Sequence, residues 1–207
     1  MRRPWGIFLA GALLLAAAAL FPPVRFHRLR AERPAAAGFQ APAYARKFWR
    51  ERLLPAGERA APASEVLAAL RRDPAAAEKK YGRTIGDSDT RYFFFQGTGT
   101  VVADGKSGVA LALAGGGADL IFPTGFLFGN AVRDASGLLD PGAFANSQDF
   151  NAVAAELNHL VETRVLPALR DGARPGRRLR FVAAAEVDPD DGPARPLPAV
   201  PVEAAFE

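Results

Sequence analysis

The hydrophobic residues at the start of the chain form one uncharged run, residues 4–21, which two arginines precede and two prolines follow. A helix that crosses a membrane needs about 17–25 apolar residues, and residues 5–21 reach the lower end of that range. The two prolines end such a helix because neither can donate a backbone N–H. We therefore expect residues 1–21 to form an N-terminal transmembrane helix that acts as a signal anchor.

A cleaved signal peptide is the alternative for the same residues. Its apolar stretch is roughly 7–15 residues long and ends at a small-x-small cleavage site. Ala16–Ala19 offer such a site, but Leu20 and Phe21 extend the apolar run beyond it. The arginines leave the orientation open, because four of them follow the run and counting Lys and Arg alone favours the reverse insertion. From the short N terminus and the exportable domain behind it, we expect a single-pass inner-membrane protein whose C-terminal domain lies in the periplasm.

Proline, alanine and arginine dominate residues 22–40, a composition typical of a linker. Beyond it, four segments place apolar residues at helical spacing. Serine or aspartate stands at three of their starts, where its side chain can accept a hydrogen bond from the first free N–H groups of the helix. These helices form the helical part, residues 41–82 and 147–171, of one α+β domain over residues 41–207. The expected helices begin at Pro42, Ser64, Asp73 and Ser147.

From residue 91 the pattern changes to β-branched and aromatic residues, which favour strands. Asp104-Gly105 is a hairpin turn signal between the first two strands. Five short strands with a long helix between the third and the fourth suit the OB-fold. We therefore predict an α+β protein with a helical subdomain and a small OB-like five-stranded β-barrel, residues 91–134 and 177–207. The expected strands cover residues 92–102, 109–113, 120–128, 179–187 and 200–206.

The positive charge of the chain is concentrated near its N terminus. The sequence pI is about 9.8, but residues 1–34 hold six arginines and one glutamate, whereas residues 35–207 hold 20 basic and 21 acidic side chains. A nearly neutral domain lacks the electrostatic footprint of a nucleic-acid-binding protein. The basic N-terminal stretch suits anionic lipid headgroups instead. We expect no nucleic-acid partner.

Residue types that commonly carry catalysis or bind metals are scarce. The 207 residues include no cysteine, which excludes disulfides, thiolate nucleophiles and cysteine-ligated metals. Of the two histidines, His27 follows the apolar run, and His159 falls on the polar side of the long helix expected from Ser147. No serine has the pattern of a nucleophile elbow. We expect no catalytic residue, metal or cofactor; the alternative is an envelope hydrolase that uses Asp134 or His159.

One polar segment, residues 130–134, stands between apolar neighbours. Within it, Arg133 and Asp134 are adjacent opposite charges that follow an apolar strand and a glycine. A partly buried arginine here would hold an anionic or hydroxyl-rich ligand, and Asp134 would accept hydrogen bonds from it. The alternative is a structural ion pair that fixes the loop to the barrel.

Six stretches of the chain resemble a known bacterial family. They are FQAPAYARKFWRERLLPA, RRDPAAAEKKYGR, FFFQGTGTVV, FLFGNAVRDA, FANSQDFNAVAAELN and VPVEAAFE, spread over residues 39–207. In their order and spacing they resemble the family called domain of unknown function 2291, described as predicted periplasmic lipoproteins. The resemblance implies an envelope protein with an OB-like part and a helical part, often encoded beside sugar ABC importers and without an established enzymatic activity.

The resemblance also places the signature residues of the family on this chain, and it shows two departures. The lipidated cysteine of the lipoprotein members is missing, so anchoring must rely on the apolar helix. The Gly-Pro that usually precedes the Arg-Asp motif is replaced by Thr124-Gly125-Phe126. The positions that match the signature are Gly129, Arg133, Asp134, Phe150, Asn151 and Asn158. With the polar segment, the candidate ligand-binding residues are Asn130, Arg133, Asp134, Phe150, Asn151 and Asn158.

Together these observations predict a membrane-anchored periplasmic accessory or binding protein. We expect it to contact the inner membrane through its N-terminal helix. We also expect it to bind a small, sugar-like molecule or a component of a transporter, such as a sugar ABC importer. The alternatives are an envelope hydrolase and a purely structural envelope protein.

Overall fold

The computed structural model describes residues 38–207, apart from residue 87 and residues 189–191. Residues 39–207 form one compact unit. The expected transmembrane helix, residues 1–21, and most of the expected linker therefore lie outside the described residues. Within the described part, no helix combines the length and the apolar character needed to cross a membrane.

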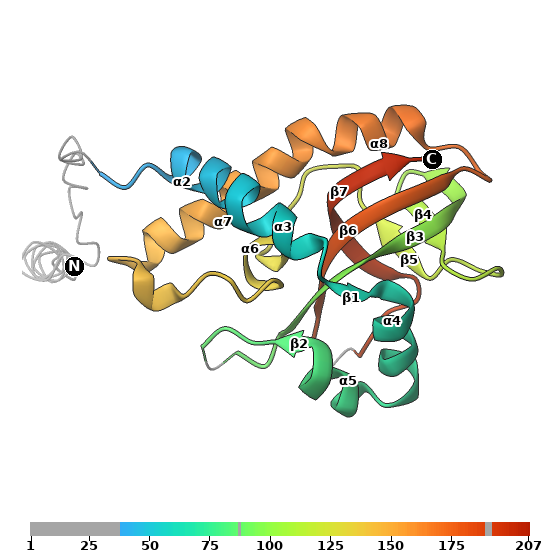
Figure 1. Ribbon diagram of the computed structural model, residues 1–207, viewed down its shortest axis with the longest axis horizontal. Helices are drawn as coiled ribbons and strands as arrows, with labels where there is room; N and C mark the ends of the chain where they lie inside the picture. The colour runs from blue at the N-terminus through green and yellow to red at the C-terminus, as the bar shows by residue number, and fades with distance from the viewer. Residues whose placement is uncertain (1–37, 87, 189–191) are drawn as a thin grey trace, which may run out of the picture. The chain divides into compact units, whose positions relative to one another are not determined.

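Five strands of the sheet pair in a closed circuit (Figure 1). Four of the pairings are antiparallel, and the pairing of β5 with β7 is parallel. Closing a sheet on itself satisfies backbone groups that an edge strand would leave unpaired. In pairing order the circuit is β3 (Arg91–Gly105), β4 (Gly108–Ala112), β5 (Leu120–Phe122), β7 (Leu197–Phe206) and β6 (Arg178–Val187), which pairs again with β3.

The prediction of an α+β fold is confirmed, but among the described residues the sheet has seven strands rather than the five expected. The two additional strands, β1 (Ala61–Pro62) and β2 (Gly82–Arg83), are two residues long and both pair with β3. They escape sequence analysis because two residues are too few to show an alternating pattern.

Three predicted strand boundaries differ from the structure by three residues or more. The third strand ends at Phe122 instead of residue 128, because Pro123 has no N–H to continue the ladder. The last strand begins at Leu197, three residues before the expected start. The first strand continues to Gly105, because the hairpin reverses between Gly105 and Gly108 rather than at Asp104-Gly105.

Helices precede β3 in the chain, and three of them contact it. α2 (Ala41–Phe48) continues through a π-helical turn (Trp49–Leu53) into α3 (Leu54–Gly57), and α4 (Ala63–Arg72) and α5 (Pro74–Tyr81) follow β1. A π-helical turn widens a helix locally and is frequent at functional sites. Here it places Trp49 and Leu53 in the core, where both side chains are buried.

The helix caps confirm one sequence prediction and correct two others. Asp73 caps α5 as predicted, because its carboxylate accepts a hydrogen bond from Ala76 N at 3.0 Å. The expected cap Ser64 lies inside α4, and Pro62 stands at the N-cap position. The longest helix in the described part of the chain, α7 (Ser147–Arg164), is capped by Asn146, the residue before the predicted cap. Its amide oxygen accepts from the backbone N–H of Asp149 at 2.8 Å.

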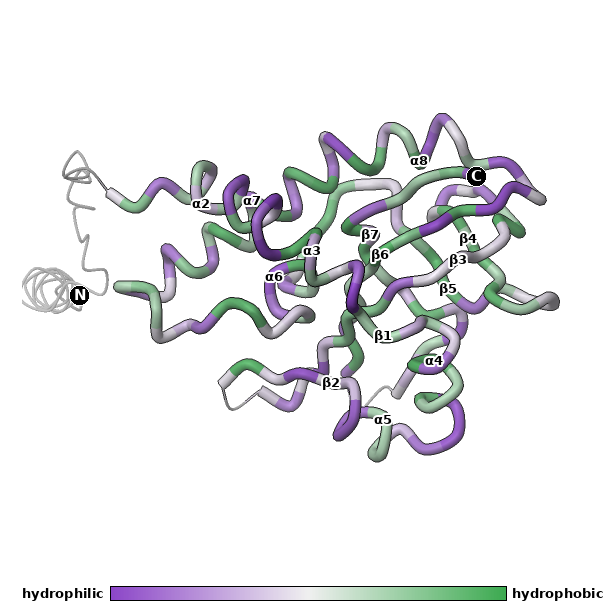
Figure 2. The backbone as a smooth tube through the Cα atoms, in the orientation of Figure 1, coloured by the Kyte–Doolittle hydropathy of each residue, from purple (hydrophilic) through white to green (hydrophobic). Residues whose placement is uncertain are grey.

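The long helix α7 lies beside α2 and connects the helical part to the strands (Figure 1). Along α7 the tube of Figure 2 alternates between hydrophobic and hydrophilic residues, as expected of a helix with one buried face. A short turn, Val165, separates it from α8 (Leu166–Gly172). The predicted helix is therefore interrupted before Pro167, whose missing N–H suits the first turn of a new helix.

Four phenylalanines on the strands have fully buried side chains. The ring centroids of Phe122 and Phe181 are 5.2 Å apart, and those of Phe95 and Phe181 are 6.5 Å apart, both edge to face. Burying one phenylalanine side chain contributes about 1.5–3 kcal/mol relative to leaving it in water. Aromatic side chains from β3, β5 and β6 therefore pack together in the core. The four residues are Phe93, Phe95, Phe122 and Phe181.

Candidate functional site

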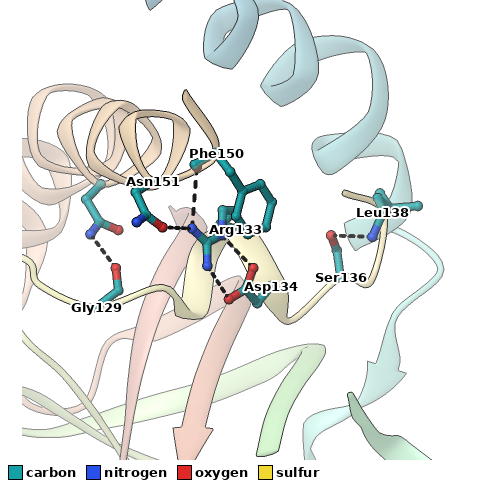
Figure 3. Close-up of polar contacts among 8 residues, drawn as sticks. Gly129, Arg133, Asp134, Ser136, Leu138, Phe150 and Asn151 are labelled. Carbon is teal, nitrogen blue, oxygen red and sulfur yellow. Dashed lines mark hydrogen bonds and ion pairs between the residues drawn. The ribbon is translucent and has the colours of Figure 1, made fainter. Parts of the chain in front are cut away.

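The structure brings the predicted site residues together where a short helix meets α7 (Figure 3). The short helix is α6 (Ala131–Asp134), and Asn130 stands at its N-cap position. It follows Gly129, whose φ of +85° is a left-handed conformation that glycine adopts without strain. The remaining candidates, Phe150, Asn151 and Asn158, lie on α7.

Arg133 is buried, with 4% of its surface exposed, and its guanidinium group is surrounded by partners. Its Nε and Nη2 donate to the two carboxylate oxygens of Asp134 at 2.6 and 2.8 Å. Its Nη1 donates to Asn151 Oδ1 at 2.9 Å and to the carbonyl oxygen of Phe150 at 3.4 Å. These contacts tie α6 to the first turn of α7.

The ring of Phe150 completes this enclosure. The guanidinium carbon of Arg133 lies 3.7 Å from the centroid of the Phe150 ring, and a desolvated cation–π contact of this kind contributes on the order of 2 kcal/mol. Phe150 in turn packs on Phe144, with ring centroids 5.2 Å apart. Phe144 contacts Tyr44 of α2 and Phe39, the first residue of the folded unit. A continuous set of contacts therefore runs from Arg133 to Phe39, where the folded unit begins.

Asn158 makes a second connection between α7 and the segment before α6. Its side-chain nitrogen donates to the carbonyl oxygen of Gly129 at 3.0 Å, and the residue is 7% exposed. Throughout the described residues, every buried side-chain nitrogen and oxygen has a hydrogen-bond partner. Of the two interpretations of Arg133 and Asp134, the geometry favours the structural ion pair, because the two side chains direct most of their hydrogen-bonding groups at each other and at α7.

Residues 123–130, which the sequence predicts as strand continuing into a loop, form an irregular connection between β5 and α6. We call it the β5–α6 loop. It is held at three points: Leu127 N donates to Glu162 Oε1 at 2.7 Å, Arg170 Nε donates to the carbonyl oxygen of Thr124 at 2.8 Å, and Asn158 donates to Gly129 as described above. Leu127 is buried, whereas its neighbours Phe126 and Phe128 are 84% and 86% exposed.

The hydrolase alternative receives no support from geometry. His159 lies on the exposed side of α7, as the sequence predicts, and its carbonyl oxygen accepts from Thr163 Oγ1 at 2.7 Å. Asp134 is only 2% exposed and holds Arg133. In the part of the chain that the structure describes, no three His, Cys, Asp or Glu residues are grouped so as to hold a metal ion.

Comparisons with known proteins agree with this architecture. A family model described as "Predicted periplasmic lipoprotein (DUF2291)" matches residues 12–204. The chain belongs to the DUF2291 family. The crystal structure of an OB-fold protein from Thermotoga maritima is similar to this DUF2291 chain with a TM-score of 0.73 and 29% sequence identity, over 82% of this chain and 99% of that protein. No curated protein matches the chain.

Family membership confirms the resemblance inferred from the sequence and points to the cell envelope. The match to an OB-fold protein agrees with the closed circuit of five strands. The DUF2291 description names lipoproteins, whereas this sequence contains no cysteine to which a lipid could be attached. Ligand binding by Asn130, Arg133, Asp134, Phe150, Asn151 and Asn158 stays a prediction.

Sequence reasoning missed two residues of this DUF2291 site, Tyr92 on β3 and Glu186 on β6. They face each other across the antiparallel pair β3–β6, and Glu186 Oε2 lies near Gly129, 3.3 Å from where a Cβ would stand. Burial raises the pKa of Tyr92 to about 12, and the carboxylates of Glu186 and Asp134 act in the same direction. Burial followed by the Asp134 charge also raises the pKa of Glu186, against a hydrogen bond from the backbone of Asn130.

Proposed function

We propose that this protein is a non-enzymatic accessory protein of the cell envelope that docks onto a membrane protein through the β5–α6 loop. In this proposal residues 1–21 anchor it in the inner membrane, and the domain of residues 41–207 faces the periplasm. The observation that carries the proposal is the exposure of Phe126 and Phe128, at 84% and 86%, on a loop that hydrogen bonds hold in place.

Contact of both aromatic side chains with water is unfavourable, and a bound partner that covers them would remove this cost. Exposed apolar patches on soluble domains mark interaction sites, and aromatic residues carry much of the energy of protein interfaces. Full burial of each phenylalanine would contribute about 1.5–3 kcal/mol. Because Leu127 between them is already buried, the loop presents both rings outward without having to rearrange.

The Arg133–Asp134 pair helps to hold the β5–α6 loop in place. It fixes α6, the element that follows the loop, to α7, and α7 also supplies Glu162, which holds the backbone of Leu127. A preorganised loop loses less conformational entropy on binding than a mobile one. A sugar-like ligand held by Arg133 itself is less well supported, because the guanidinium group is already engaged.

The resemblance to proteins encoded beside sugar ABC importers supports a membrane component of such an importer as the partner. A photoreactive phenylalanine analogue placed at residue 128 of the full chain, in its own cells, tests the proposal. We expect adducts with an integral membrane protein of the transporter, identified by mass spectrometry. The matched control is the same analogue at Lys79, which is exposed on α5.

Two outcomes contradict the proposal. One is the absence of protein adducts at residues 126 and 128, including the case in which only lipid adducts form. The other is the same set of adducts from residue 79, which would show contacts by proximity alone. A Phe126→Ser, Phe128→Ser double variant should also lose the complex in co-purification while keeping its melting temperature.

A further inference from the structure

A pocket outside the site described above lies between α4, the segment before β5 and the segment before β7. It is an open pocket with a volume of about 180 Å³. Drug-sized ligands occupy larger pockets, about 300–1,000 Å³. An occupant of this pocket is therefore a small metabolite. The residues that matter for its chemistry are Leu67, Leu70, Arg71, Asp119, Arg195 and Leu197.

The inner wall of the pocket is aliphatic. Leu67, Leu70 and Leu197 are 4%, 2% and 3% exposed, and all three line the space. Aliphatic side chains offer no hydrogen bonds, so this wall favours a hydrocarbon group over a hydroxyl-rich one. A sugar would leave its hydroxyl groups unpaired against it.

An ion pair with Asp119 holds the Arg71 side chain in place at the pocket. Its Nη1 donates to Asp119 Oδ1 at 2.8 Å, and the other carboxylate oxygen of Asp119 accepts from Leu113 N at 2.9 Å. Backbone hydrogen bonds to Leu111 and Leu197 fix Asp119 further. Arg71 Nε and Nη2 make no hydrogen bond to another described residue, which leaves one edge of the planar guanidinium fork for a ligand.

The charges around the pocket favour one negative charge on that ligand. Two arginines and one aspartate line it, and the aspartate is already paired with Arg71. Arg195 makes no ion pair with any other described residue and lies at the exposed side. A carboxylate fits this arrangement, because the guanidinium fork matches its two oxygens geometrically and charge-assisted hydrogen bonds are stronger than neutral ones.

We propose that this pocket binds a small monocarboxylate with a short aliphatic group, its carboxylate on Arg71 and Arg195 and its hydrocarbon part against Leu67, Leu70 and Leu197. The site is separate from the β5–α6 loop and does not rest on the docking function. The two can fail independently, because one concerns a small molecule and the other a membrane protein.

Binding of 4-methylpentanoate to the full chain in detergent tests the proposal, with the uncharged 4-methylpentanamide as the matched ligand. We expect the acid to raise the melting temperature in a concentration-dependent manner and the amide to have no effect. Arg71→Gln should weaken binding about tenfold or more, the loss of a charge-assisted hydrogen bond. Arg72→Gln is the matched control, because Arg72 is the next residue of α4 and does not line this pocket.

Arg71→Gln also removes the ion pair with Asp119, so a loss of binding in this variant could come from a change in the pocket. A second variant controls for this. Arg195→Gln leaves that pair intact and should weaken binding as well. The proposal is overturned if neither acid nor amide binds at millimolar concentration, or if both bind equally. It is also overturned if Arg71→Gln and Arg195→Gln bind the acid as tightly as Arg72→Gln does.

Discussion

Arg133 and Asp134 are neighbours in the chain, yet their side chains meet in a bidentate ion pair, with nitrogen–oxygen distances of 2.6 and 2.8 Å. Side chains of adjacent residues on a regular helix do not face each other. Here α6 is only four residues long, and α7 closes over the pair from the other side. The pair lies on α6, and Arg133 also donates hydrogen bonds to α7. It therefore connects these two helices.

Removing the arginine alone should be strongly destabilising. Arg133→Ala leaves the Asp134 carboxylate buried without its partner, and breaking a buried pair in this way costs about 3–5 kcal/mol. We expect a loss of that size in the free energy of unfolding measured by urea denaturation. Arg46→Ala, on the exposed side of α2, should change the free energy of unfolding by less than about 0.5 kcal/mol.

Replacing both partners shows whether the ion pair itself stabilises the fold, or whether the loss in Arg133→Ala comes only from the unpaired carboxylate that it leaves. An apolar pair of similar volume is often neutral or stabilising relative to a buried ion pair. We therefore expect Arg133→Met, Asp134→Leu to be more stable than Arg133→Ala. If the double variant is the less stable of the two, the hydrogen bonds of Arg133 to α7 carry more of the stability than the pair itself.

Tyr92 should ionise later than an ordinary tyrosine. Its pKa is raised to about 12, because burial and the nearby carboxylates disfavour the phenolate. Of the three tyrosines of the chain, one should therefore titrate near pH 12 when absorbance at 295 nm is followed. Tyr92→Phe should remove that step. Because the pKa is higher in the folded state, stability that is complete below pH 10 is lost as the pH rises towards 12.

Glu186 makes the free energy of unfolding depend on pH above the ordinary pKa of a glutamate. Its pKa is raised above the ordinary value of 4.5, so the folded state holds a proton that the unfolded state has released. The free energy of unfolding therefore falls as the pH rises through this window. Glu186→Gln should raise the melting temperature at pH 7 and leave it unchanged below pH 4.5. An equal gain at both pH values would contradict the assignment.

Two glycines of one hairpin should respond differently to the same substitution. Gly108 has a φ of +127°, and a Cβ there would collide with the carbonyl oxygen of Phe122 on β5. Gly105, at the other end of the turn, has nothing within 4 Å of a Cβ. We expect Gly108→Ala to cost at least about 1–3 kcal/mol more than Gly105→Ala, measured by chemical denaturation. Equal costs would mean that β4 and β5 separate easily at this point.

Local patterns account for the parts of this fold that were predicted correctly. Asp73 caps α5 because its carboxylate needs only a backbone N–H three residues away, and this spacing is visible in the sequence. The same holds for the buried face of α7, which repeats with the period of a helix. The cluster around Arg133 was found as a group of residues, but its partners on α7 came from the family resemblance.

Long-range register accounts for the parts that could not be predicted. Tyr92 meets Glu186 only because β3 and β6 pair in one particular register, which no local pattern specifies. The exposure of Phe126 and Phe128 is not predicted because a local pattern is misleading here. Their apolar character favours a strand, but Pro123 ends the strand before them. Apolar letters in a sequence do not distinguish a buried side chain from one presented to a partner.

The β5–α6 loop offers the clearest separation of a surface role from a structural one. Leu127 is 8% exposed and its two aromatic neighbours are more than 80% exposed, so three consecutive apolar residues should behave in two ways. Leu127→Ala should lower the free energy of unfolding by about 2–5 kcal/mol, the usual cost of truncating a buried leucine. Phe126→Ser and Phe128→Ser should leave it within about 0.5 kcal/mol, because neither ring contributes buried surface. A large loss in either serine variant would mean that the ring packs against the domain in solution, and the loop would then no longer be available as a docking surface.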